Sequence, residues 1–534
     1  MNFRKFKLPL MVIVLTIGIL LGTQIQRVFS GDNLIENIKK FNDVLTFTQR
    51  FYVEEVDSHK MVEAAIKGML NELDPHSVYI PKKAMESVEE ETRGNFEGVG
   101  IEFQIVNDTL TVVSPITGGP SEQLGIQAGD RILKIDSVNV IGINNDDVRK
   151  KLRGPAGTKV KVSISRIGVK GLTDYEITRD KIPLYSVDTK IMVDDITGYV
   201  SVSRFAEQTT DELINALGEL KSKGMKQLIL DLRNNPGGYL NQAFQIADLF
   251  IDGNKKIVYT RGRRPEFNED FYASLTAPYE KIPLIVLINR GSASASEIVS
   301  GAVQDWDRGL VVGETSFGKG LVQRQFPLND GSAIRLTISE YFTPSGRLIQ
   351  RKFSDKKDYY SELMERDESE GENLSHTAEK DTARPIYKTN GGRIVYGGGG
   401  ITPDFIVKSE KLTDYSANLL RKNIFYLFIL NYLNVEGESI KSKYGDDLIS
   451  FKNNFNLTES DLKDFTEFAN SKEVTFNSEE FNKDKNYISA RLKAQIARNY
   501  WKNDGWYTVL IPSDNVIRKA STLFDTAKEI AKLK

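Results

Sequence analysis

The 534-residue chain contains no cysteine, which excludes several kinds of chemistry at once. It forms no disulfide, no zinc–thiolate site and no lipid-modified N-terminal cysteine, and it has no thiol nucleophile. Histidine is scarce as well, since only His59, His76 and His376 occur, so few residues could serve as the histidine base of a Ser-His-Asp triad. The formal net charge of −2 shows no basic excess, which leaves nucleic-acid binding without support.

The N-terminus has the pattern of an export signal. Arg4, Lys5 and Lys7 precede an apolar run from residue 8 to residue 22, and the chain turns polar from Thr23 onward. The run is shorter than the roughly 20 residues of a typical membrane span, so it predicts a signal peptide or a short signal anchor. The basic flank predicts that everything after residue 30 is exported to the periplasm or cell envelope, with inner-membrane anchoring if the segment is retained.

A cluster of serines follows a buried-strand pattern. The apolar run Ile282–Ile288 leads into Gly291-Ser-Ala-Ser-Ala-Ser-Glu297, and the apolar spacing becomes helical from there. This predicts a strand, a sharp turn and a helix, where a serine hydroxyl lies beside unsatisfied N–H groups that can stabilise an oxyanion. Ordinary N-capping is the alternative, because serine also caps helices well. The pattern does not choose among Ser292, Ser294 and Ser296.

Lys319, between Gly318 and Gly320, is the candidate base for such a serine. A free lysine amine has a pKa of about 10.4 and is charged at neutral pH, but burial disfavours the charged form and lowers the pKa. A lysine in a dry cleft can therefore accept the serine proton. The amide of Gln323 could orient the amine. Taken alone, Gly-Lys-Gly is more often an exposed turn.

A second strand-glycine-helix unit precedes the serine cluster. Leu228–Arg233 has a buried-strand pattern, Asn234–Gly238 contains paired glycines, and an amphipathic run follows from Tyr239 to Phe250. Paired glycines let backbone N–H groups point into a cavity, as in half of an oxyanion hole. A tight connection that needs positive φ is the plainer alternative.

Together these residues resemble the C-terminal processing peptidases. The similarity runs from about Leu34 to Val407, and it includes Leu73–Tyr79, the Asp231–Gly238 block, the serine cluster and Thr315–Gln323. The resemblance implies a Ser/Lys dyad, with Ser294 as nucleophile, Lys319 as general base and Gln323 as its support. It implies an oxyanion hole built from the backbone N–H of Ala295 and of Gly237 or Gly238. Asp305, after the serine helix, has a functional or a structural role by the same resemblance.

The segment from Gly98 to Arg166 resembles a PDZ domain. Short alternating strands are predicted at 110–113, 131–135 and 160–165, with a short helix at 145–152. A small structural β domain is the alternative. PDZ domains capture an extended peptide by strand addition and hold its terminal carboxylate with backbone N–H groups. The matching substrate-tail loop here consists of Val99, Gly100, Ile101, Glu102 and Phe103.

Three other segments have simpler patterns. Helical apolar spacing, as at Val62, Ile66 and Met69, predicts an N-terminal helical arm that could mediate dimerisation. Residues 354–383 are charged and poor in apolar groups, which predicts a solvated loop or disordered insert. From Lys411 onward the pattern predicts helices, including 487–501 and 515–532, in an accessory domain that packs on the protease or docks a partner.

We therefore predict a multidomain α+β protein, with a crotonase/ClpP-like α/β serine-protease core, an inserted PDZ domain, an N-terminal helical arm and a C-terminal helical extension. The boundaries are 1–30 for the signal segment, 31–92 for the arm, 93–168 for the PDZ domain, 169–410 for the peptidase and 411–534 for the extension.

The predicted function is a serine endopeptidase that processes or degrades envelope proteins from near their C-termini. The predicted partners are protein or peptide substrates with free C-termini. An adaptor protein, a homodimer or higher oligomer, and membrane association through the N-terminal segment remain open. We expect no nucleic acid, metal or cofactor. A catalytically idle PDZ scaffold is one alternative, and a Ser-His-Asp esterase that uses one of the three histidines is the other.

Overall fold

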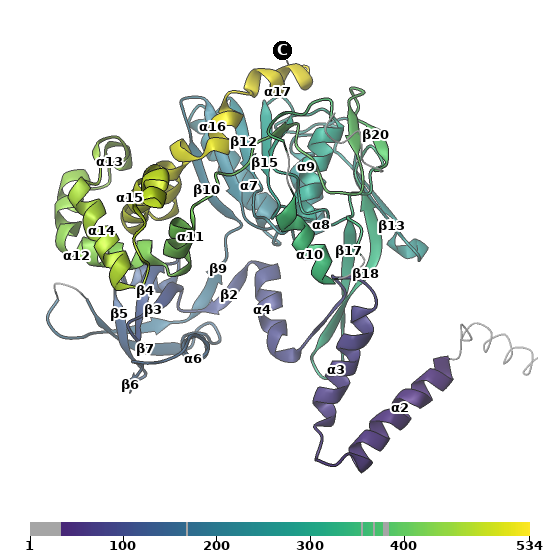
Figure 1. Cartoon of the computed structure of the whole chain (residues 1–534), viewed down its shortest axis with the longest axis horizontal. Helices are drawn as coiled ribbons and strands as arrows, with labels where there is room; N and C mark the ends of the chain where they lie inside the picture. Colours follow the sequence, from purple (N-terminus) through teal and green to yellow (C-terminus); the bar gives the residue numbers. More distant parts are fainter. Residues whose placement is uncertain (1–33, 167–168, 354–355, 367–368, 377–383, 534) are drawn as a thin grey trace, which may run out of the picture. The chain divides into compact units, whose positions relative to one another are not determined.

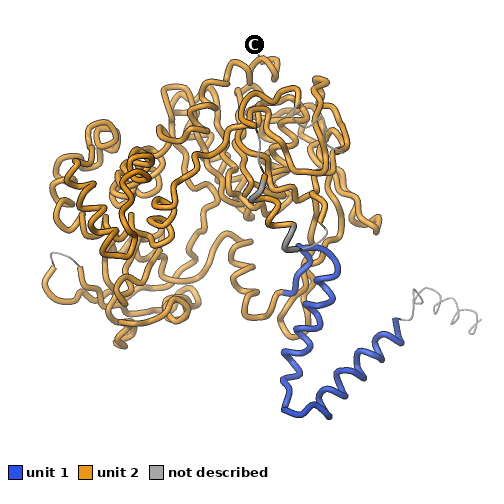
Figure 2. The backbone as a smooth tube through the Cα atoms, viewed as in Figure 1, with its two compact units in different colours: residues 1–79 blue, residues 80–534 orange. Residues whose placement is uncertain are grey.

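The computed structural model describes residues 34–166, 169–353, 356–366, 369–376 and 384–533. The predicted signal segment, residues 1–30, lies outside these residues. The chain forms two compact units, residues 1–79 and residues 80–534 (Figure 2).

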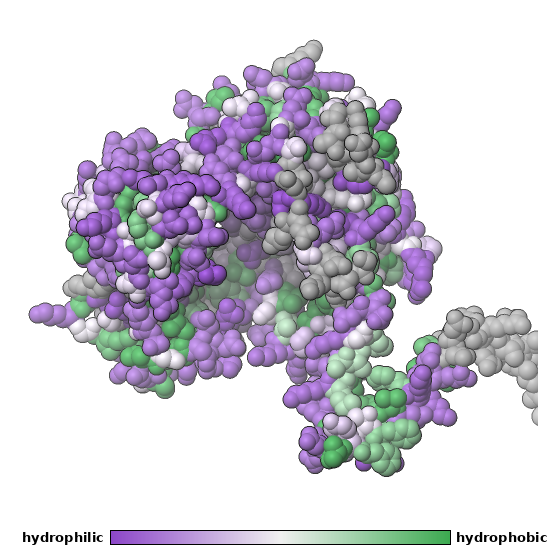
Figure 3. Space-filling view, in the orientation of Figure 1, coloured by the Kyte–Doolittle hydropathy of each residue, from purple (hydrophilic) through white to green (hydrophobic). Residues whose placement is uncertain are grey.

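Unit 1 contains the predicted N-terminal helices, α2 (Leu34–Phe51) and α3 (Ser58–Asn71). The Asp57 side chain caps α3 by accepting hydrogen bonds from the backbone N–H groups of His59 and Lys60. No residue of α2 is buried, and its apolar side chains Phe41, Phe47 and Phe51 are 41%, 59% and 75% exposed. Apolar surface therefore gathers on these two helices (Figure 3). The short strand β1 (Val78–Ile80) follows at the end of the unit.

The PDZ fold predicted for the following segment is confirmed (Figure 1). Its sheet has the order β3-β4-β5-β7-β8, with β6 paired to β5, so β3 is an edge strand. The strands are β3 (Ile101–Val106), β4 (Thr109–Pro115), β5 (Arg131–Ile135), β6 (Val138–Asn139), β7 (Lys159–Ser165) and β8 (Thr173–Thr178), and the helices are α5 (Pro120–Gln123) and α6 (Asn145–Leu152).

The chain enters and leaves the PDZ domain through a two-stranded ribbon. After α4 (Lys82–Arg93), strand β2 (Asn95–Gly98) pairs antiparallel with β9 (Asp180–Pro183). The ribbon leads directly into the protease sheet.

The segment predicted as the protease core contains a seven-stranded sheet with the order β10-β11-β12-β15-β16-β22-β19. Strands β11, β12, β15, β16 and β22 are parallel, and β10 and β19 are antiparallel edges. The strands are β10 (Val187–Met192), β11 (Thr197–Val202), β12 (Gln227–Asp231), β15 (Leu284–Ile288), β16 (Leu310–Gly313), β19 (Gly371–Glu372) and β22 (Phe405–Ile406).

Both faces of this sheet are covered, which explains its continuous apolar strands. Along β15, Val286 and Ile288 pack in the core with α7 (Thr209–Ser222), α8 (Leu240–Asp248) and α9 (Ala295–Asp305). Ile285 and Leu287 point the other way and pack against α16 (Asn515–Ser521) and α17 (Phe524–Ile530). The last two helices of the chain thus form part of the protease core.

A second sheet carries the segment after Lys319. Strand β18 pairs with β17 and β13, and β13 pairs with β14. The strands are β13 (Lys256–Gly262), β14 (Glu269–Tyr272), β17 (Leu321–Pro327) and β18 (Ala333–Phe342), with the short helix η1 at Pro265–Phe267 and a separate hairpin of β20 (Ile386–Lys388) and β21 (Ile394–Tyr396).

The segment predicted as a solvated insert has structure where it is described. It contains α10 (Lys356–Glu365), and Asn373 and His376 are 4% and 0% exposed. The charged composition of this segment does not indicate its contacts, which include polar partners of His376 in Asn373 and Asp404 and the packing of Leu374 on the core of the sheet.

The C-terminal region is helical, as predicted, but 487–501 is part of the longer α15 (Ser478–Leu510), and the helix predicted at 515–532 is divided into α16 and α17. Besides α15, α16 and α17, its helices are α11 (Asp414–Arg421), α12 (Ile424–Tyr444), α13 (Leu448–Asn454) and α14 (Glu459–Ser471), and η3 (Ile511–Ser513) follows α15. Helices α11–α15 enclose their own core, which includes Phe425, Phe451 and Phe465. None of the helices in the described part of the chain is long and apolar enough to cross a membrane.

Candidate active site

Ser294 lies at the predicted strand–turn–helix junction, between the end of β15 and the start of α9. Its backbone has φ 53° and ψ −109°, a conformation that residues other than glycine rarely adopt. Such backbone geometry is frequent at functional positions.

The structure distinguishes the three serines by burial. Ser292 and Ser296 are both 0% exposed, whereas Ser294 is half-buried. The Ser292 hydroxyl donates to the Leu232 carbonyl at 2.8 Å, and the Ser296 hydroxyl donates to the Asn235 carbonyl at 2.9 Å. These two hydroxyls tie the serine turn to the glycine segment, which leaves Ser294 as the serine that a substrate can reach.

Glu297 connects the serine turn to the lysine loop. Its carboxylate is 0% exposed. Oε2 accepts from the Ser294 amide at 2.7 Å and from the Lys319 amide at 2.9 Å. Oε1 accepts from the Ser316 hydroxyl at 2.5 Å and from the Gly318 amide at 2.6 Å. Burial raises the pKa of Glu297, against the four hydrogen bonds that favour the carboxylate.

No role was assigned to Glu297 from the sequence, although the sequence contains a pattern that indicates one. Serine followed three residues later by glutamate is the capping-box pattern, in which the glutamate side chain binds the N-cap amide. Glu297 makes that bond to Ser294, but it also binds three groups of the lysine loop, which no local pattern indicates.

Lys319 is half-buried in the loop between β16 and β17. Gly318 before it has φ 87°, and a Cβ there would lie 2.5 Å from Cγ of Arg351, so the loop requires glycine. Gln323 follows in β17, and its buried amide nitrogen has no acceptor among the described residues.

Gly237, the first of the paired glycines, lies against the serine turn. A Cβ on Gly237, which has φ 98°, would lie 2.9 Å from both the Ala295 amide nitrogen and the Ser294 Cβ. The Gly237 amide donates to Asn235 Oδ1 at 2.9 Å. By contrast, the amides of Gly238 and Ala295 have no acceptor in the part of the chain that the structure describes.

A buried ion pair holds the strand that leads into this glycine segment. Arg233 donates to both carboxylate oxygens of Asp231, at 3.0 and 2.6 Å, and pairs with Asp514 at 2.9 Å. The Tyr199 hydroxyl donates to Asp231 at 2.7 Å. A residue of the C-terminal extension thus supports the end of β12.

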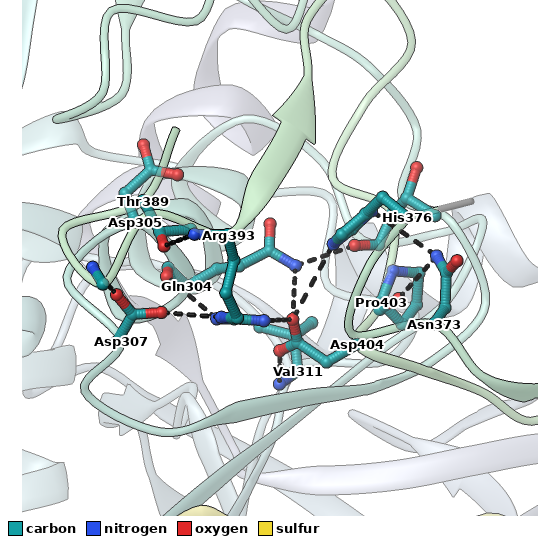
Figure 4. A network of polar contacts seen from close by, with 12 residues as sticks. Gln304, Asp305, Asp307, Val311, Asn373, His376, Thr389, Arg393, Pro403 and Asp404 are labelled. Carbon is teal, nitrogen blue, oxygen red and sulfur yellow. Dashed lines mark hydrogen bonds and ion pairs between the residues drawn. The ribbon is translucent and has the colours of Figure 1, made fainter. Parts of the chain in front are cut away.

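Asp305 lies at the opposite end of α9 from Ser294, in a buried polar network (Figure 4). Its carboxylate pairs with Arg347 at 2.5 Å, and both side chains are 1% exposed. Nearby, Arg393 donates to Asp404 at 2.5 Å. Burial alone would raise the pKa of Asp404, but Arg393 and neighbouring donors lower it to about 2. This position assigns Asp305 a structural role.

His376, the histidine in the same unit as Ser294, is bound elsewhere. His376 belongs to the network of Figure 4, where its Nε2 lies 3.9 Å from Asp404 Oδ1. His59 is 73% exposed, and it lies with His76 in unit 1. No group of three or more acidic or histidine side chains among the described residues could hold a metal ion.

The predicted tail loop of the PDZ domain adjoins the edge strand β3. Gly100 has φ 73°, and the Val99 carbonyl accepts from the Ser121 hydroxyl at 2.5 Å. The amides of Val99 and Gly100 have no backbone acceptor among the described residues. Ile101 is buried, Phe103 is half-buried, and Glu102 points to the opposite face, where it pairs with Arg498 at 3.0 Å.

Family models match four segments of the chain. Peptidase family S41 matches residues 196–358, a PDZ domain matches 111–166, and the N-terminal domain of the activating protease CtpB matches 23–84. A family of unknown function, DUF8443, matches residues 415–502.

Known proteins are similar to this chain over about 60% of its length. The carboxy-terminal-processing protease of Bartonella bacilliformis is 41% identical over 322 residues, which are 60% of this chain and 74% of the relative. The carboxy-terminal processing protease CtpA of Bacillus subtilis is 36% identical over 327 residues, 60% of this chain and 68% of the relative. A solved structure, the photosystem II D1 C-terminal processing protease, is 31% identical, covers 58% of this chain and 83% of its own, and has a TM-score of 0.34.

The protease core and the PDZ domain define a PDZ-containing serine peptidase of family S41. The chain belongs to the carboxy-terminal processing proteases. It is therefore an enzyme that acts on protein or peptide substrates, and neither the idle scaffold nor the Ser-His-Asp esterase is favoured.

Proposed function

We propose that Ser294 and Lys319 form the catalytic dyad, and that the enzyme cleaves proteins whose free C-termini are captured by the PDZ domain. One observation supports the assignment of this dyad. Ser294 is the serine of the cluster that is not fully buried, and its amide binds the same carboxylate oxygen as the amide of Lys319.

In this mechanism the Ser294 hydroxyl attacks the scissile carbonyl while its proton moves to the neutral Lys319 amine. Lys319 then donates that proton to the leaving amine, and the acyl group stays on Ser294. A water molecule, deprotonated by Lys319, releases the acyl group and restores the serine. Glu297 does not transfer protons here. It holds the two backbone segments at a fixed separation.

The oxyanion of each tetrahedral intermediate would be stabilised by the amides of Ala295 and Gly238, which have no acceptor among the described residues. Gly237 contributes in another way, because its missing side chain leaves room beside Ala295. Gln323 is proposed to support the Lys319 amine. Its buried amide nitrogen has no acceptor among the described residues, so it can also donate a hydrogen bond to bound substrate.

Tail capture is supported by the free edge of β3 and by the amides of Val99 and Gly100. An extended C-terminus can pair with this edge, and its carboxylate can accept from the loop amides. The other members of the proposed loop are Ile101, Glu102 and Phe103.

The location and assembly of the enzyme are further parts of the proposal. The basic and apolar pattern of residues 4–22 supports export to the periplasm or cell envelope, with membrane association if the segment is retained. The exposed apolar side chains of α2 support pairing of this helix with a second copy of the chain. An adaptor protein that delivers substrates would be consistent with a tail-binding domain.

The test uses one unstructured protein substrate with either a free or an amidated C-terminus. Cleavage is followed by mass spectrometry below KM, and the Ser294→Ala enzyme is the control for contaminating proteases. We expect cleavage near the C-terminus, faster for the free tail, because amidation removes the charge that the loop amides bind. Equal rates for both tails contradict tail capture, and equal cleavage by Ser294→Ala contradicts the dyad.

A further inference from the structure

The PDZ domain is attached to the rest of its unit at two places. The first is the β2–β9 ribbon, in which Asn95 to Gly98 pair with Pro183 to Asp180, together with an ion pair of Arg153 with Glu90 of α4 at 2.5 Å. A two-stranded ribbon is only marginally stable by itself. The ribbon alone therefore does not fix the orientation of the PDZ domain.

The second attachment is made by the C-terminal helices, which contact the PDZ domain through polar side chains. The outward side chains of the edge strand β3 take part, and so do side chains at α5. The contacts are Arg498 with Glu102 at 3.0 Å, Asn423 with Gln104 at 2.7 Å, Lys502 with Thr117 at 3.1 Å, and the ion pair of Lys502 with Glu122. In the two ion pairs, the C-terminal helices supply the cations and the PDZ domain supplies the carboxylates.

A kink in α15 lets one short segment hold two domains. Trp501 and Lys502 have non-helical backbones, with φ 52° and ψ −139° at Lys502. Lys502 binds the PDZ domain, while the next two residues bind β10 of the protease sheet. Asn503 donates to the Asp188 carbonyl at 3.1 Å, and Asp504 accepts from the Thr189 hydroxyl at 3.4 Å.

The C-terminal helices contact the protease sheet and the PDZ domain in different ways. Toward the protease, α16 and α17 share an apolar core with the central sheet, and Asp514 pairs with the buried Arg233. Toward the PDZ domain, the contacts are hydrogen bonds and ion pairs beside a small pocket of about 20 Å³, which Val113 lines together with apolar side chains of α12 such as Ile429 and Leu433. The Tyr426 hydroxyl beside it is buried and has no partner among the described residues. The PDZ side is thus the side that can separate.

We propose that the C-terminal helical domain, including the segment 415–502 of unknown function, is a brace that binds the chain's own PDZ domain and fixes its orientation toward the active site. The inference rests on the tail capture proposed above. A braced PDZ domain keeps a captured tail at a high effective concentration near Ser294. Loss of the brace therefore raises KM for substrates with free tails and leaves kcat for a short peptide without a PDZ-binding tail unchanged.

The absence of cysteine permits a direct distance measurement. Val138 on β6 and Val435 on α12 are 53% and 80% exposed, so Val138→Cys and Val435→Cys can carry two spin labels in the full-length protein. We expect a narrow distance distribution, and a broad one after Arg498→Glu with Lys502→Glu. Adding Glu102→Lys and Glu122→Lys exchanges the charges and should restore the narrow distribution. Lys463→Glu, a single charge reversal in α14 at a residue paired with Glu467, should leave it narrow.

Activity supplies the second readout. In the Arg498→Glu, Lys502→Glu enzyme, the preference for free over amidated tails should fall at least fivefold through KM, while kcat for the short peptide stays unchanged. A narrow distance distribution in this variant overturns the brace, and so does a broad one that the exchanged charges fail to restore. A broad distribution with full tail preference overturns the link to catalysis. If the unmodified enzyme shows no tail preference, tail capture fails, and the distances still decide the brace.

Discussion

The backbone amides of Ser294 and Lys319 donate to the same oxygen of the buried Glu297, at 2.7 and 2.9 Å. Two loops that are distant in sequence are thus fixed to one acceptor. A dyad requires the nucleophile and its base within hydrogen-bond reach, and small displacements are costly in rate. Glu297 is therefore a positioning residue for the proposed chemistry.

The first prediction concerns this carboxylate. Glu297→Gln replaces one acceptor oxygen by an amide group that faces N–H or O–H donors, so at least one buried donor loses its partner. We expect kcat to fall by about 100-fold and the free energy of unfolding by about 1–3 kcal/mol. Steady-state kinetics and urea unfolding measure both. Glu219→Gln, at a residue 52% exposed in α7, is the control, and equal kinetics for the two variants would refute the positioning role.

The second prediction concerns the proton acceptor. Lys319→Arg keeps the positive charge but cannot supply a neutral base, because arginine stays protonated in proteins. We expect hydrolysis to drop to background while the fold, followed by circular dichroism, is unchanged. Lys352→Arg, at an exposed lysine, should be fully active. Substantial turnover by Lys319→Arg rules out the general-base role.

The third prediction concerns the space beside the oxyanion amides. In Gly237→Ala the new Cβ would lie 2.9 Å from the Ala295 nitrogen and from the Ser294 Cβ, so the turn must move. We expect kcat to fall by about 100-fold, as when an oxyanion donor is lost. Gly392→Ala is the control. Gly392 also has a positive φ, 86° against 98° at Gly237, but a Cβ on Gly392 would have no atom within 4 Å. If both variants kept normal kcat, the glycine segment would not shape the site.

The fourth prediction concerns pH and the network behind α9. The pKa of Asp404 in the folded protein is about 2, below its usual value of 3.8. The carboxylate therefore contributes stability above about pH 4, and this contribution is lost as the pH falls toward 2. At 1.36 kcal/mol per pKa unit, it is worth about 2 kcal/mol at neutral pH.

Asp404→Asn should therefore lower the free energy of unfolding at pH 7 by about 2 kcal/mol or more, since Arg393 also loses its partner. The difference from the unmodified protein should shrink as the pH falls below 4. Asp525→Asn, at a residue 98% exposed, is the control and should change neither the free energy of unfolding at pH 7 nor its dependence on pH. A constant difference from pH 7 to pH 3 contradicts the assigned ionisation.

Much of the architecture could be predicted from local patterns. The buried runs Leu228–Arg233 and Ile282–Ile288, each followed by glycine, predicted two strands, and the structure has them as β12 and β15, which pair in parallel. The PDZ strand at 131–135 and the helix at 145–152 have the predicted bounds. These elements are set by periodicity and turn residues, which a single sequence contains.

Other features depend on contacts between distant segments. Ser292 and Ser296 differ from Ser294 because their hydroxyls bind carbonyls about 60 residues away, which no spacing indicates. The helix predicted to end at Trp501 continues through a kink at Lys502, where α15 binds two domains. His376 is buried and contacts Asn373 and Asp404, whereas the charged sequence around it predicted a solvated loop.

The most direct test of the central claim compares the three serines in one assay. Ser294→Ala, Ser292→Ala and Ser296→Ala enzymes are incubated with the same unstructured protein, and cleavage is quantified by mass spectrometry, with circular dichroism to normalise for folded protein. We predict no cleavage above background for Ser294→Ala, because loss of a lone nucleophile costs orders of magnitude in rate, and measurable cleavage for the other two. Normal turnover by Ser294→Ala together with an inactive, folded Ser296→Ala enzyme would contradict the account.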